Sequence, residues 1–433
     1  MKRWYSSRAL TTVLTTGLVL TASGYAHADG RNESRGAYAP ASGPVTIAMA
    51  VSGSNQELAI RQEEANAFTK VHPDIKITFV NLGPNRLQKT LTLIAGGNPP
   101  DIFYINDWAK PLAMKGALMP LDTFIKNDRS FHLNQYYPNL VHALVSNGKL
   151  YGLPQEVSPV AIYYNADLFR KAGLALPTDN WTQATFMADA KKLSDASKKR
   201  YGFYMSDWYA FWGGFVARNG GTVYRDNGTR SGFNSAGALT GLTVMRQMVV
   251  DNHSSPSPAA EQALGQGDDA LFRNQQVAMI YAGMWYLPEF KQQPLSFRWD
   301  VVRVPKAKNQ ITEAGILNWS ISAQTQHAQQ AWEVLKFFTG PQGAKIVAKY
   351  QFALPAITNE TALDIVRASH YPPNVQAFIT SAPLVTVQEQ DSPKSNEVDT
   401  AIQTQVDLML EGRQSANSAQ TQIVDAMNKI LGQ

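Results

Sequence analysis

The sequence predicts an α/β protein with two or three domains, and three observations support this prediction. Its 433 residues suffice for that number at about 100–200 residues per domain. Residues 45–105 follow the order strand, helix, strand, helix, strand, which is typical of parallel strands joined by right-handed crossovers. Residues 148–165 contain a long strand pattern, interrupted by prolines, that could pass from one domain into another.

The first unit has clear strand and helix signals. Residues 45–51 and 75–79 place apolar side chains at every second position, which predicts two strands. Ser54 and Glu57 have the spacing of a capping box, so a helix is expected to begin there. Residues 101–105 form a short apolar run, which is typical of a strand covered on both faces.

Polar and aromatic side chains follow two of these strands. Ligands of parallel sheets lie beyond the carboxyl ends of the strands. Ser52 and Asn55 follow the first strand, and Asp107 and Trp108 follow the third. We therefore expect these four residues to line a binding site, although Asp107 could instead cap a helix.

The stretch Gly148–Asn165 is the centre of the predicted organisation. Pro154 and Pro159 interrupt it, and the run after Pro159 is β-branched and aromatic, which predicts a strand. Glu156 is the acid between the two prolines. One interpretation is a crossover strand that places Glu156 at a cleft between domains; the other is an ordinary strand edge with a solvated glutamate.

Further candidates lie in the second half of the chain. Trp208 and Trp212 are four residues apart, so they share a face if helical, and they face either a ligand or a core. Trp285 follows a predicted strand and has the same two interpretations. Asn318 and Trp319 lie on a second candidate crossover over residues 313–322.

The N-terminus has the pattern of an export signal. Three basic residues precede an uncharged, mostly apolar stretch over residues 9–20, and Ala26-His27-Ala28 is a small-x-small cleavage site. We expect residues 1–28 to be a cleaved signal peptide and residues 29–43 a flexible leader. With no cysteine for a lipid anchor, the mature protein is expected in the periplasm.

Composition excludes several classes of protein. Hydrophobic residues make up 44% and charged residues 17% of the chain, which suits a soluble globular protein. The net charge of +5 is small and the basic residues are scattered along the chain, so we expect no nucleic-acid partner. The absence of cysteine excludes disulfides, a cysteine nucleophile and thiolate metal sites. The histidines lack metal-ligand spacing, and no phosphate loop is present, so we expect neither metal nor cofactor.

Several short motifs occur in an order and spacing that resemble a known family. The resemblance covers about residues 45–359, and its motifs are Gly97-Asn98-Pro99-Pro100-Asp101-Ile102-Phe103, Gly148-Lys149-Leu150-Tyr151-Gly152-Leu153-Pro154, Tyr163-Tyr164-Asn165, Ala282-Gly283-Met284-Trp285 and Ala331-Trp332-Glu333. In these motifs the chain resembles the family 1 extracellular solute-binding proteins of bacterial ABC importers, which include the maltose-binding and glycerol-phosphate-binding proteins.

The resemblance implies a fold and a function. It implies the type II periplasmic-binding-protein fold, with two α/β lobes, each a mainly parallel sheet flanked by helices, and a hinge of crossing segments. The first lobe would hold residues 44–155 and 316–350, and the second residues 156–313 and 354–433. It also implies a solute bound between the lobes, a membrane permease as partner, and a monomer.

The resemblance also implies site residues. Those matching ligand contacts of the maltose-binding member are Ser52, Asp107, Glu156 and Trp285, although that member has an acid at the position of Ser52. Carboxylates accept hydrogen bonds from sugar hydroxyls, and indole rings cover the apolar face of a sugar. We therefore expect a carbohydrate or related polyol as the solute.

Two other functions are compatible with acids and aromatics in a cleft. A polyamine binder of the same fold would use similar residues. A glycoside hydrolase also needs paired carboxylates, but no glycosidase segment is apparent, so we expect no enzyme.

Overall fold

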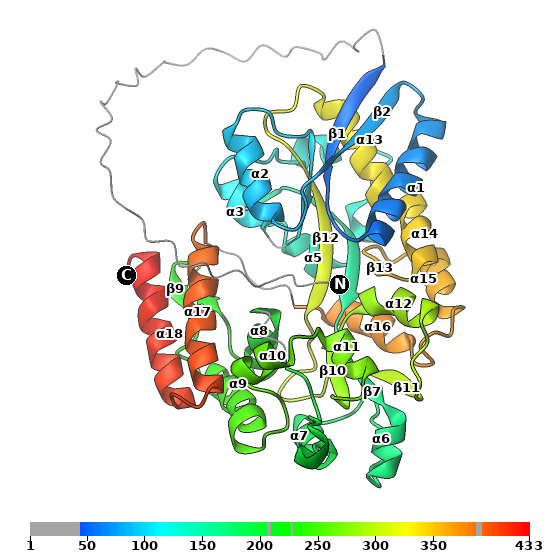
Figure 1. Cartoon of the computed structure of the whole chain (residues 1–433). Coiled ribbons are helices and arrows are strands. Elements are labelled where there is room, and N and C mark those ends of the chain that lie inside the picture. Colours follow the sequence, from blue (N-terminus) through cyan, green and yellow to red (C-terminus); the bar gives the residue numbers. More distant parts are fainter. Residues whose placement is uncertain (1–43, 107, 206–208, 227, 387–391) are drawn as a thin grey trace.

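The structure is a computed structural model that describes residues 44–433 except 107, 206–208, 227 and 387–391. The predicted signal peptide and leader, Asp107 and Trp208 therefore lie outside the described residues. The chain forms two lobes (Figure 1). We call the region where the chain passes between them, near Val160, Thr312 and Val385, the waist.

The first lobe contains a six-stranded sheet with the order β13-β6-β12-β3-β1-β2. Its strands are β1 Val45–Val51, β2 Ile75–Asn81, β3 Ile102–Ile105, β6 Leu153–Pro159, β12 Ala314–Ile321 and β13 Leu354–Pro355. The strands β1, β2 and β3 are parallel, as the strand–helix alternation predicts, whereas β12 is antiparallel to both β3 and β6.

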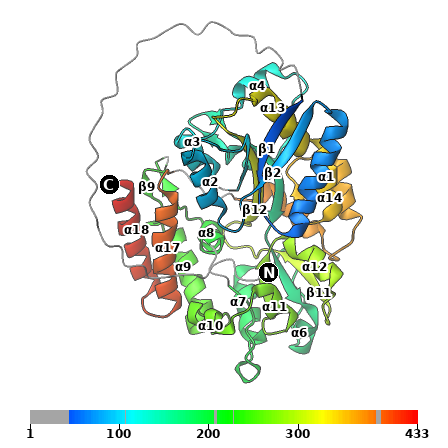
Figure 2. The ribbon, with the colours of Figure 1, turned by 45° about the horizontal axis from the view of Figure 1, so that its top comes forward.

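Helices cover both faces of this sheet. Both views show α2 and α3 on one side and α1 and α14 on the other (Figures 1 and 2). The helices of this lobe are α1 Asn55–Val71, α2 Arg86–Ala95, α3 Ala109–Met114, α4 Asp122–Asn127, η1 Leu133–Gln135, α5 Pro138–His142, α13 Ala328–Thr339, α14 Pro341–Tyr350 and α15 Glu360–Arg367. A short hairpin joins β4 Val145–Ser146 to β5 Lys149–Leu150.

The second lobe contains a three-stranded sheet with the order β10-β7-β11. Its strands are β7 Ala161–Asn165, β10 Met279–Ala282 and β11 Trp299–Arg303. Both β10 and β11 are antiparallel to β7, so the prediction of a mainly parallel sheet is wrong for this lobe. The reason is that β7 enters from the first lobe and meets strands that return from the far end of the second. In the first lobe the prediction holds for β1, β2 and β3, whereas the other three of the five strand pairs are antiparallel.

The helices of the second lobe surround that sheet. They are α6 Ala166–Lys171, α7 Gln183–Leu193, η2 Ala196–Lys198, α8 Tyr209–Arg218, α9 Ala236–Arg246, η3 Gln247–Asp251, α10 Pro258–Leu264, α11 Asp268–Arg273, η4 Met284–Tyr286, α12 Leu287–Gln292, α17 Ser395–Leu410 and α18 Ala416–Leu431. A second hairpin joins β8 Tyr224–Arg225 to β9 Arg230–Ser231.

The helix that opens the first lobe begins where the capping box predicts. Ser54 precedes α1, and its Oγ accepts a hydrogen bond of 3.3 Å from the backbone N–H of Glu57. The Glu57 carboxylate accepts 2.7 Å from the N–H of Ser54 in return. These bonds satisfy two N–H groups that have no partner within the helix.

Three segments cross the waist side by side. Val160 separates β6 from β7, and its N–H donates to the carbonyl of Glu313 at 2.8 Å. On the other side of that segment, the N–H of Thr386 donates to the carbonyl of Thr312 at 2.7 Å. The prediction of a hinge made of crossing segments is confirmed, with the segment near Val385 as a third member.

The observed segments differ from the predicted lobe boundaries at two places. The strand β6 pairs with β12 as far as Pro159, beyond residue 155. The strand β13 pairs with Val157 and Glu156 of β6, so its residues belong to the first lobe's sheet, whereas the prediction assigned residues 354–433 to the second lobe. A two-residue strand has no periodicity by which the sequence could assign it. The helix α16 Gln376–Ser381 and η5 Ala382–Leu384 follow near the waist.

Candidate functional site

Glu156 lies in β6 at the waist and is 6% exposed. The pairing of β6 with β12 shifts register here, because Leu317 pairs with Glu156 and Asn318 with Pro154. Gln155 is therefore an extra residue in the ladder, and such bulges change the direction of side chains. As a result, the consecutive side chains of Gln155 and Glu156 both reach Arg61 in α1.

Arg61 is the centre of a buried polar network. Its Nη2 donates to Glu156, and its Nη1 donates to Gln155 and lies 3.0 Å from Glu64 Oε2. The Gln155 amide donates to Glu64 Oε1 at 2.5 Å and to the carbonyl of Phe338 at 2.9 Å. Glu156 is therefore fixed in position, and the alternative of a solvated strand-edge glutamate does not hold.

The charges of this network are close to balance. Burial raises the pKa of the Glu64 carboxyl well above its usual value, which favours its protonated form. Burial lowers the pKa of Arg61, but Glu156 and Glu64 outweigh that effect and raise it overall, so the guanidinium stays charged beside Glu156. Burial also raises the pKa of Glu57, whereas Arg86 nearby lowers it. Two arginines, Arg61 and Arg86, thus lie near the carboxyl groups of Glu156 and Glu57.

Asn318 holds the carboxyl end of β3. Its Nδ2 donates to the carbonyl of Asn106 at 2.6 Å, and Asn106 Nδ2 donates to the carbonyl of Ile316 at 2.9 Å. Arg86 Nη1 donates to Asn106 Oδ1 at 3.1 Å. Asn318 is 1% exposed, so its contacts are those of a residue that positions the loop after β3.

The two candidates after β1 differ in exposure. Ser52 is buried, and its Oγ donates to the carbonyl of Gly83 at 2.9 Å, which joins the loop after β1 to the loop after β2. Asn55 is exposed at the first position of α1. Asn55 therefore offers its amide to solvent, whereas the Ser52 hydroxyl already has a partner.

Trp108 lines a small pocket between the lobes. The lining residues come from α2, α3 and the segment that opens α17: Leu87, Leu91, Trp108, Pro111, Leu112, Lys115, Pro393, Ser395 and Asn396. The α2 leucines were not among the predicted site residues, although their spacing of four places them on one helix face. At this pocket, the segment that opens α17 lies next to α2 and α3 of the first lobe.

Trp285 lies where β6 and β12 cross the waist. It is half-buried and packs against two hydrophobic clusters, one in the second lobe and one that extends through both lobes. Its ring lies against Gly283 and against Gly315 of β12. Gly315 pairs with Ser158 of β6, and Ser158 shares a strand face with Glu156 because side chains alternate. Trp285 and Glu156 are therefore close to the same face of the crossing strand.

Trp212 and Trp319 lie in hydrophobic cores, contrary to a ligand-binding role. Trp212 is 1% exposed in α8, packs on Phe233 and donates its indole N–H to Gln403. Trp319 is fully buried in β12, where its indole N–H donates to Gln155 at 2.6 Å. The surrounding helices cover both rings, so we leave them out of the site.

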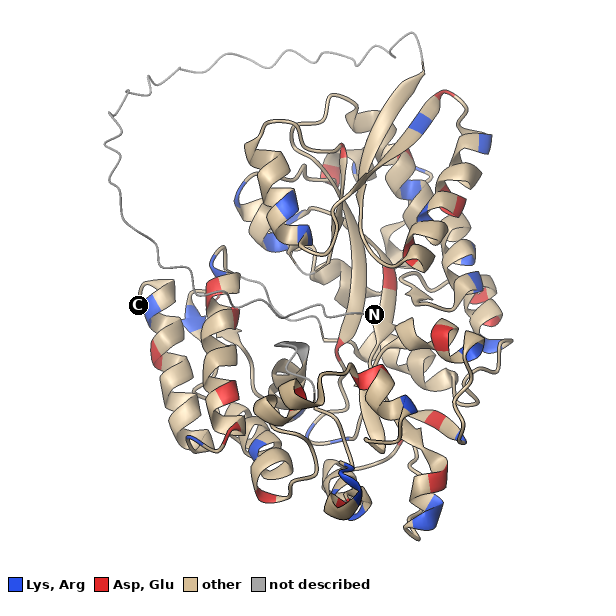
Figure 3. Cartoon of the chain, viewed as in Figure 1, with Lys and Arg blue, Asp and Glu red and all other residues tan. Residues whose placement is uncertain are grey.

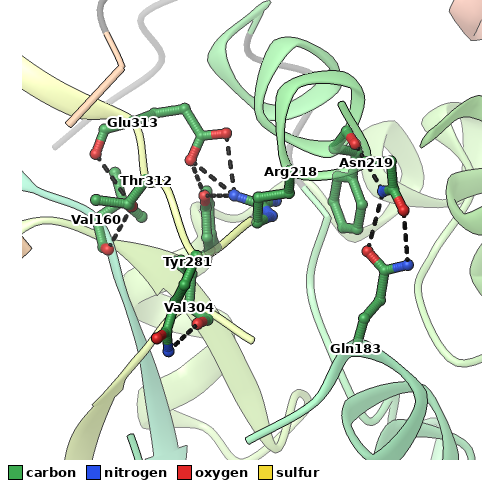
Figure 4. Close-up of polar contacts among 10 residues, drawn as sticks. Val160, Gln183, Arg218, Asn219, Tyr281, Val304, Thr312 and Glu313 are labelled. Atoms are coloured by element: carbon green, nitrogen blue, oxygen red, sulfur yellow. Dashed lines mark hydrogen bonds and ion pairs between the residues drawn. The ribbon is translucent and has the colours of Figure 1, made fainter. Parts of the chain in front are cut away.

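A second buried ion pair lies on the other side of the waist (Figure 4). Arg218 Nη1, at the end of α8, donates to both carboxylate oxygens of Glu313 at 3.1 and 3.0 Å. The same nitrogen donates to the hydroxyl of Tyr281 at 2.7 Å, and Tyr281 donates to Glu313. Local sequence patterns did not predict this cluster, because Arg218 and Glu313 are 95 residues apart in sequence.

The segment that carries Trp285 is bonded to a titratable side chain, Asp268. The hydroxyl of Tyr286, the residue after Trp285, donates to Asp268 Oδ1 at 2.6 Å. Burial raises the pKa of Asp268 to about 6, and Asp269 nearby acts in the same direction, while the bond from Tyr286 opposes them.

The raised pKa of Asp268 predicts a pH-dependent stability. A raised folded-state pKa contributes stability below the unfolded value of 3.8, and this contribution disappears as the pH rises through about 6. The free energy of unfolding of wild type minus that of Asp268→Asn should therefore fall between pH 4 and pH 6 and then level off. Urea unfolding across that range measures it, and a difference that rises with pH contradicts the prediction.

Within the described ranges, no three His, Asp or Glu side chains are grouped so that they could hold a metal ion. In the same ranges, every helix is too short or too polar to span a bilayer.

Comparisons with known proteins agree with this architecture. Residues 52–345 match the family model described as "Bacterial extracellular solute-binding protein". An ABC substrate-binding protein from Listeria monocytogenes, solved in complex with cycloalternan, is 28% identical, with a TM-score of 0.81 over 90% of this chain and 99% of that one. The sugar-binding protein MalE of Xanthomonas citri has a TM-score of 0.79 at 20% identity, over 90% of this chain and 98% of that one.

A curated relative has similar coverage. The galactooligosaccharide-binding protein of Bacillus subtilis is 23% identical over 361 residues, which is 78% of this chain and 79% of that protein. Two α/β lobes on a hinge of crossing strands define a two-lobe binding protein of type II. The chain belongs to the bacterial extracellular solute-binding protein family, and the predicted resemblance is confirmed.

Proposed function

We propose that this protein binds a carbohydrate or related polyol between its lobes and delivers it to the permease of an ABC importer without altering it. The main support for this proposal is the position of Trp285. A half-buried indole beside the crossing strands offers an apolar surface, and Glu156 on the same strand face offers an acceptor for hydroxyls. Relatives with the same fold include proteins named for galactooligosaccharide, lactose and maltotriose binding.

The charges near Glu156 favour a neutral solute over a cation. A polyamine site needs an excess of negative charge, whereas Arg61 and Arg86 lie beside Glu156 and Glu57. Acidic and basic residues are also interspersed over both lobes (Figure 3). Asn55 and Trp108 complete the proposed contacts at the first lobe, with Ser52 and Asn318 holding the loops that carry them. We further propose that the protein acts in the periplasm as a monomer after loss of residues 1–28.

Thermal and chemical unfolding with added solutes test the proposal. Maltotriose, lactose, cycloalternan, D-mannitol and spermidine form the panel. A ligand at 100 times its dissociation constant should raise the free energy of unfolding by about 2.7 kcal/mol. We expect at least one sugar or polyol to do so and to be recovered intact. Stabilisation by spermidine alone, or release of a hydrolysis product, contradicts the proposal.

Trp285→Ala should weaken binding of whichever sugar stabilises wild type about 10- to 150-fold. The reason is that the complex would lose the free energy gained when the sugar buries the indole, about 1.5–3 kcal/mol for a large apolar side chain. Isothermal titration measures this change. Tyr350→Ala is the control, since it removes a partly exposed ring from α14 whose hydroxyl donates to Glu63 of α1. Equal affinities of Trp285→Ala and wild type would remove Trp285 from the site.

A further inference from the structure

The ring of Trp285 contacts backbone that has no side chain. A Cβ atom on Gly315 would lie 3.1 Å from Cζ3 and 3.5 Å from Cε3 of the indole. A Cβ atom on Gly283 would overlap with the same edge of the ring. Two glycines from separate elements therefore allow the indole to lie directly against the crossing strands.

The backbone on either side of Trp285 is also fixed. The N–H of Met284 donates to Ser158 Oγ at 2.6 Å, and the Tyr163 hydroxyl donates to the carbonyl of Gly283 at 2.6 Å. After Trp285, Tyr286 is held by Asp268. Because these bonds fix the segment that contains Gly283 and Trp285, Gly315 is the contact from a separate strand that limits how closely the ring lies against β12.

We propose that Gly315 is a specificity-determining residue, because it sets the position of the Trp285 ring and hence the space left for the solute. This inference rests on the proposed function, in which the indole covers the flat face of a pyranose ring. An acyclic polyol has no such face and depends less on the position of the ring. Gly315 lies in β12 without a positive φ, so alanine fits the backbone, and only the indole opposes it.

The affinities of Gly315→Ala for a pyranoside and an acyclic polyol test the proposal. We expect binding of maltotriose or cycloalternan to weaken about 2- to 12-fold, the range of one aromatic contact. Binding of D-mannitol should change less than about twofold. In a Trp285→Ala background, Gly315→Ala should have no further effect, because the ring that transmits the change is gone. An equal loss with and without Trp285 overturns the proposal.

A ligand-free measurement separates this inference from the proposed function. The chain has nine tryptophans, so the fluorescence of Trp285 is isolated as the difference between each protein and its Trp285→Phe counterpart. Acrylamide should quench that difference signal more strongly in Gly315→Ala than in wild type, because the ring is displaced toward solvent. Unchanged quenching overturns the inference. If no sugar binds wild type, the proposed function fails, while the quenching result still decides whether Gly315 positions the ring.

Discussion

Replacing Arg61 by alanine should lower the free energy of unfolding by about 3–5 kcal/mol, because it leaves buried carboxylates without their cation. Arg61 is 2% exposed and contacts Gln155, Glu64 and Glu156. Glu156 would then be buried without its counter-charge, and the bulge in β6 would lose the side chain that both of its polar residues contact. Urea unfolding at pH 7 measures the change.

A surface pair of the same kind provides the control. Arg298 contacts Asp167 at 2.7 Å, but its side chain is 72% exposed, so Arg298→Ala should cost at most about 1 kcal/mol. Adding Glu156→Gln to Arg61→Ala should restore part of the stability, because it removes one unpaired charge. Equal effects of Arg61→Ala and Arg298→Ala would show that the buried network contributes no more than a surface pair.

Gly214→Ala should destabilise the protein by about 3–5 kcal/mol, although the same change inside an ordinary helix stabilises by up to about 1 kcal/mol. A Cβ atom on Gly214 of α8 would occupy the space of Glu313 Oε1. The Glu313 carboxylate would have to leave Arg218, which breaks a buried ion pair. Thermal and urea unfolding measure the change in the free energy of unfolding, and its sign is the main result.

The double variant identifies the cause. In a Glu313→Ala background the carboxylate is absent, so Gly214→Ala should become neutral or stabilising, up to the helix-propensity difference of about 1 kcal/mol. If Gly214→Ala destabilises both backgrounds equally, its effect does not come from contact with Glu313.

The two buried ion pairs attach the crossing strands to opposite lobes. Glu156 in β6 is bonded to α1 of the first lobe, and Glu313, directly before β12, is bonded to α8 of the second. Between them, Val160 and Thr312 are joined by a 2.8 Å hydrogen bond from the threonine hydroxyl (Figure 4). This arrangement leaves the backbone near Val160, Thr312 and Val385 as the place where the lobes can bend relative to each other.

Local pattern was sufficient for much of the fold. Strand alternation and the capping box predicted β1, β2 and the start of α1, because each depends on neighbours in sequence. The proline-interrupted stretch predicted a strand shared between lobes, and the structure has β6 and β7 in different sheets on either side of Val160. Motif order likewise sufficed to predict the family.

Those local patterns could not predict contacts between residues that are distant in sequence. An indole is equally compatible with a core and a cleft, so only packing placed Trp212 and Trp319 inside and Trp285 at the waist. The directions of β10 and β11 depend on how β7 enters the second lobe, not on their own residues.

The sequence by itself therefore determined the strand–helix order, the crossing strands and the family, because these follow from local periodicity and spacing. The tertiary structure alone decided which charges meet, since Arg61 and Glu156 are 95 residues apart, as are Arg218 and Glu313. The physical reason is that burial and pairing depend on which surfaces the folded chain brings together.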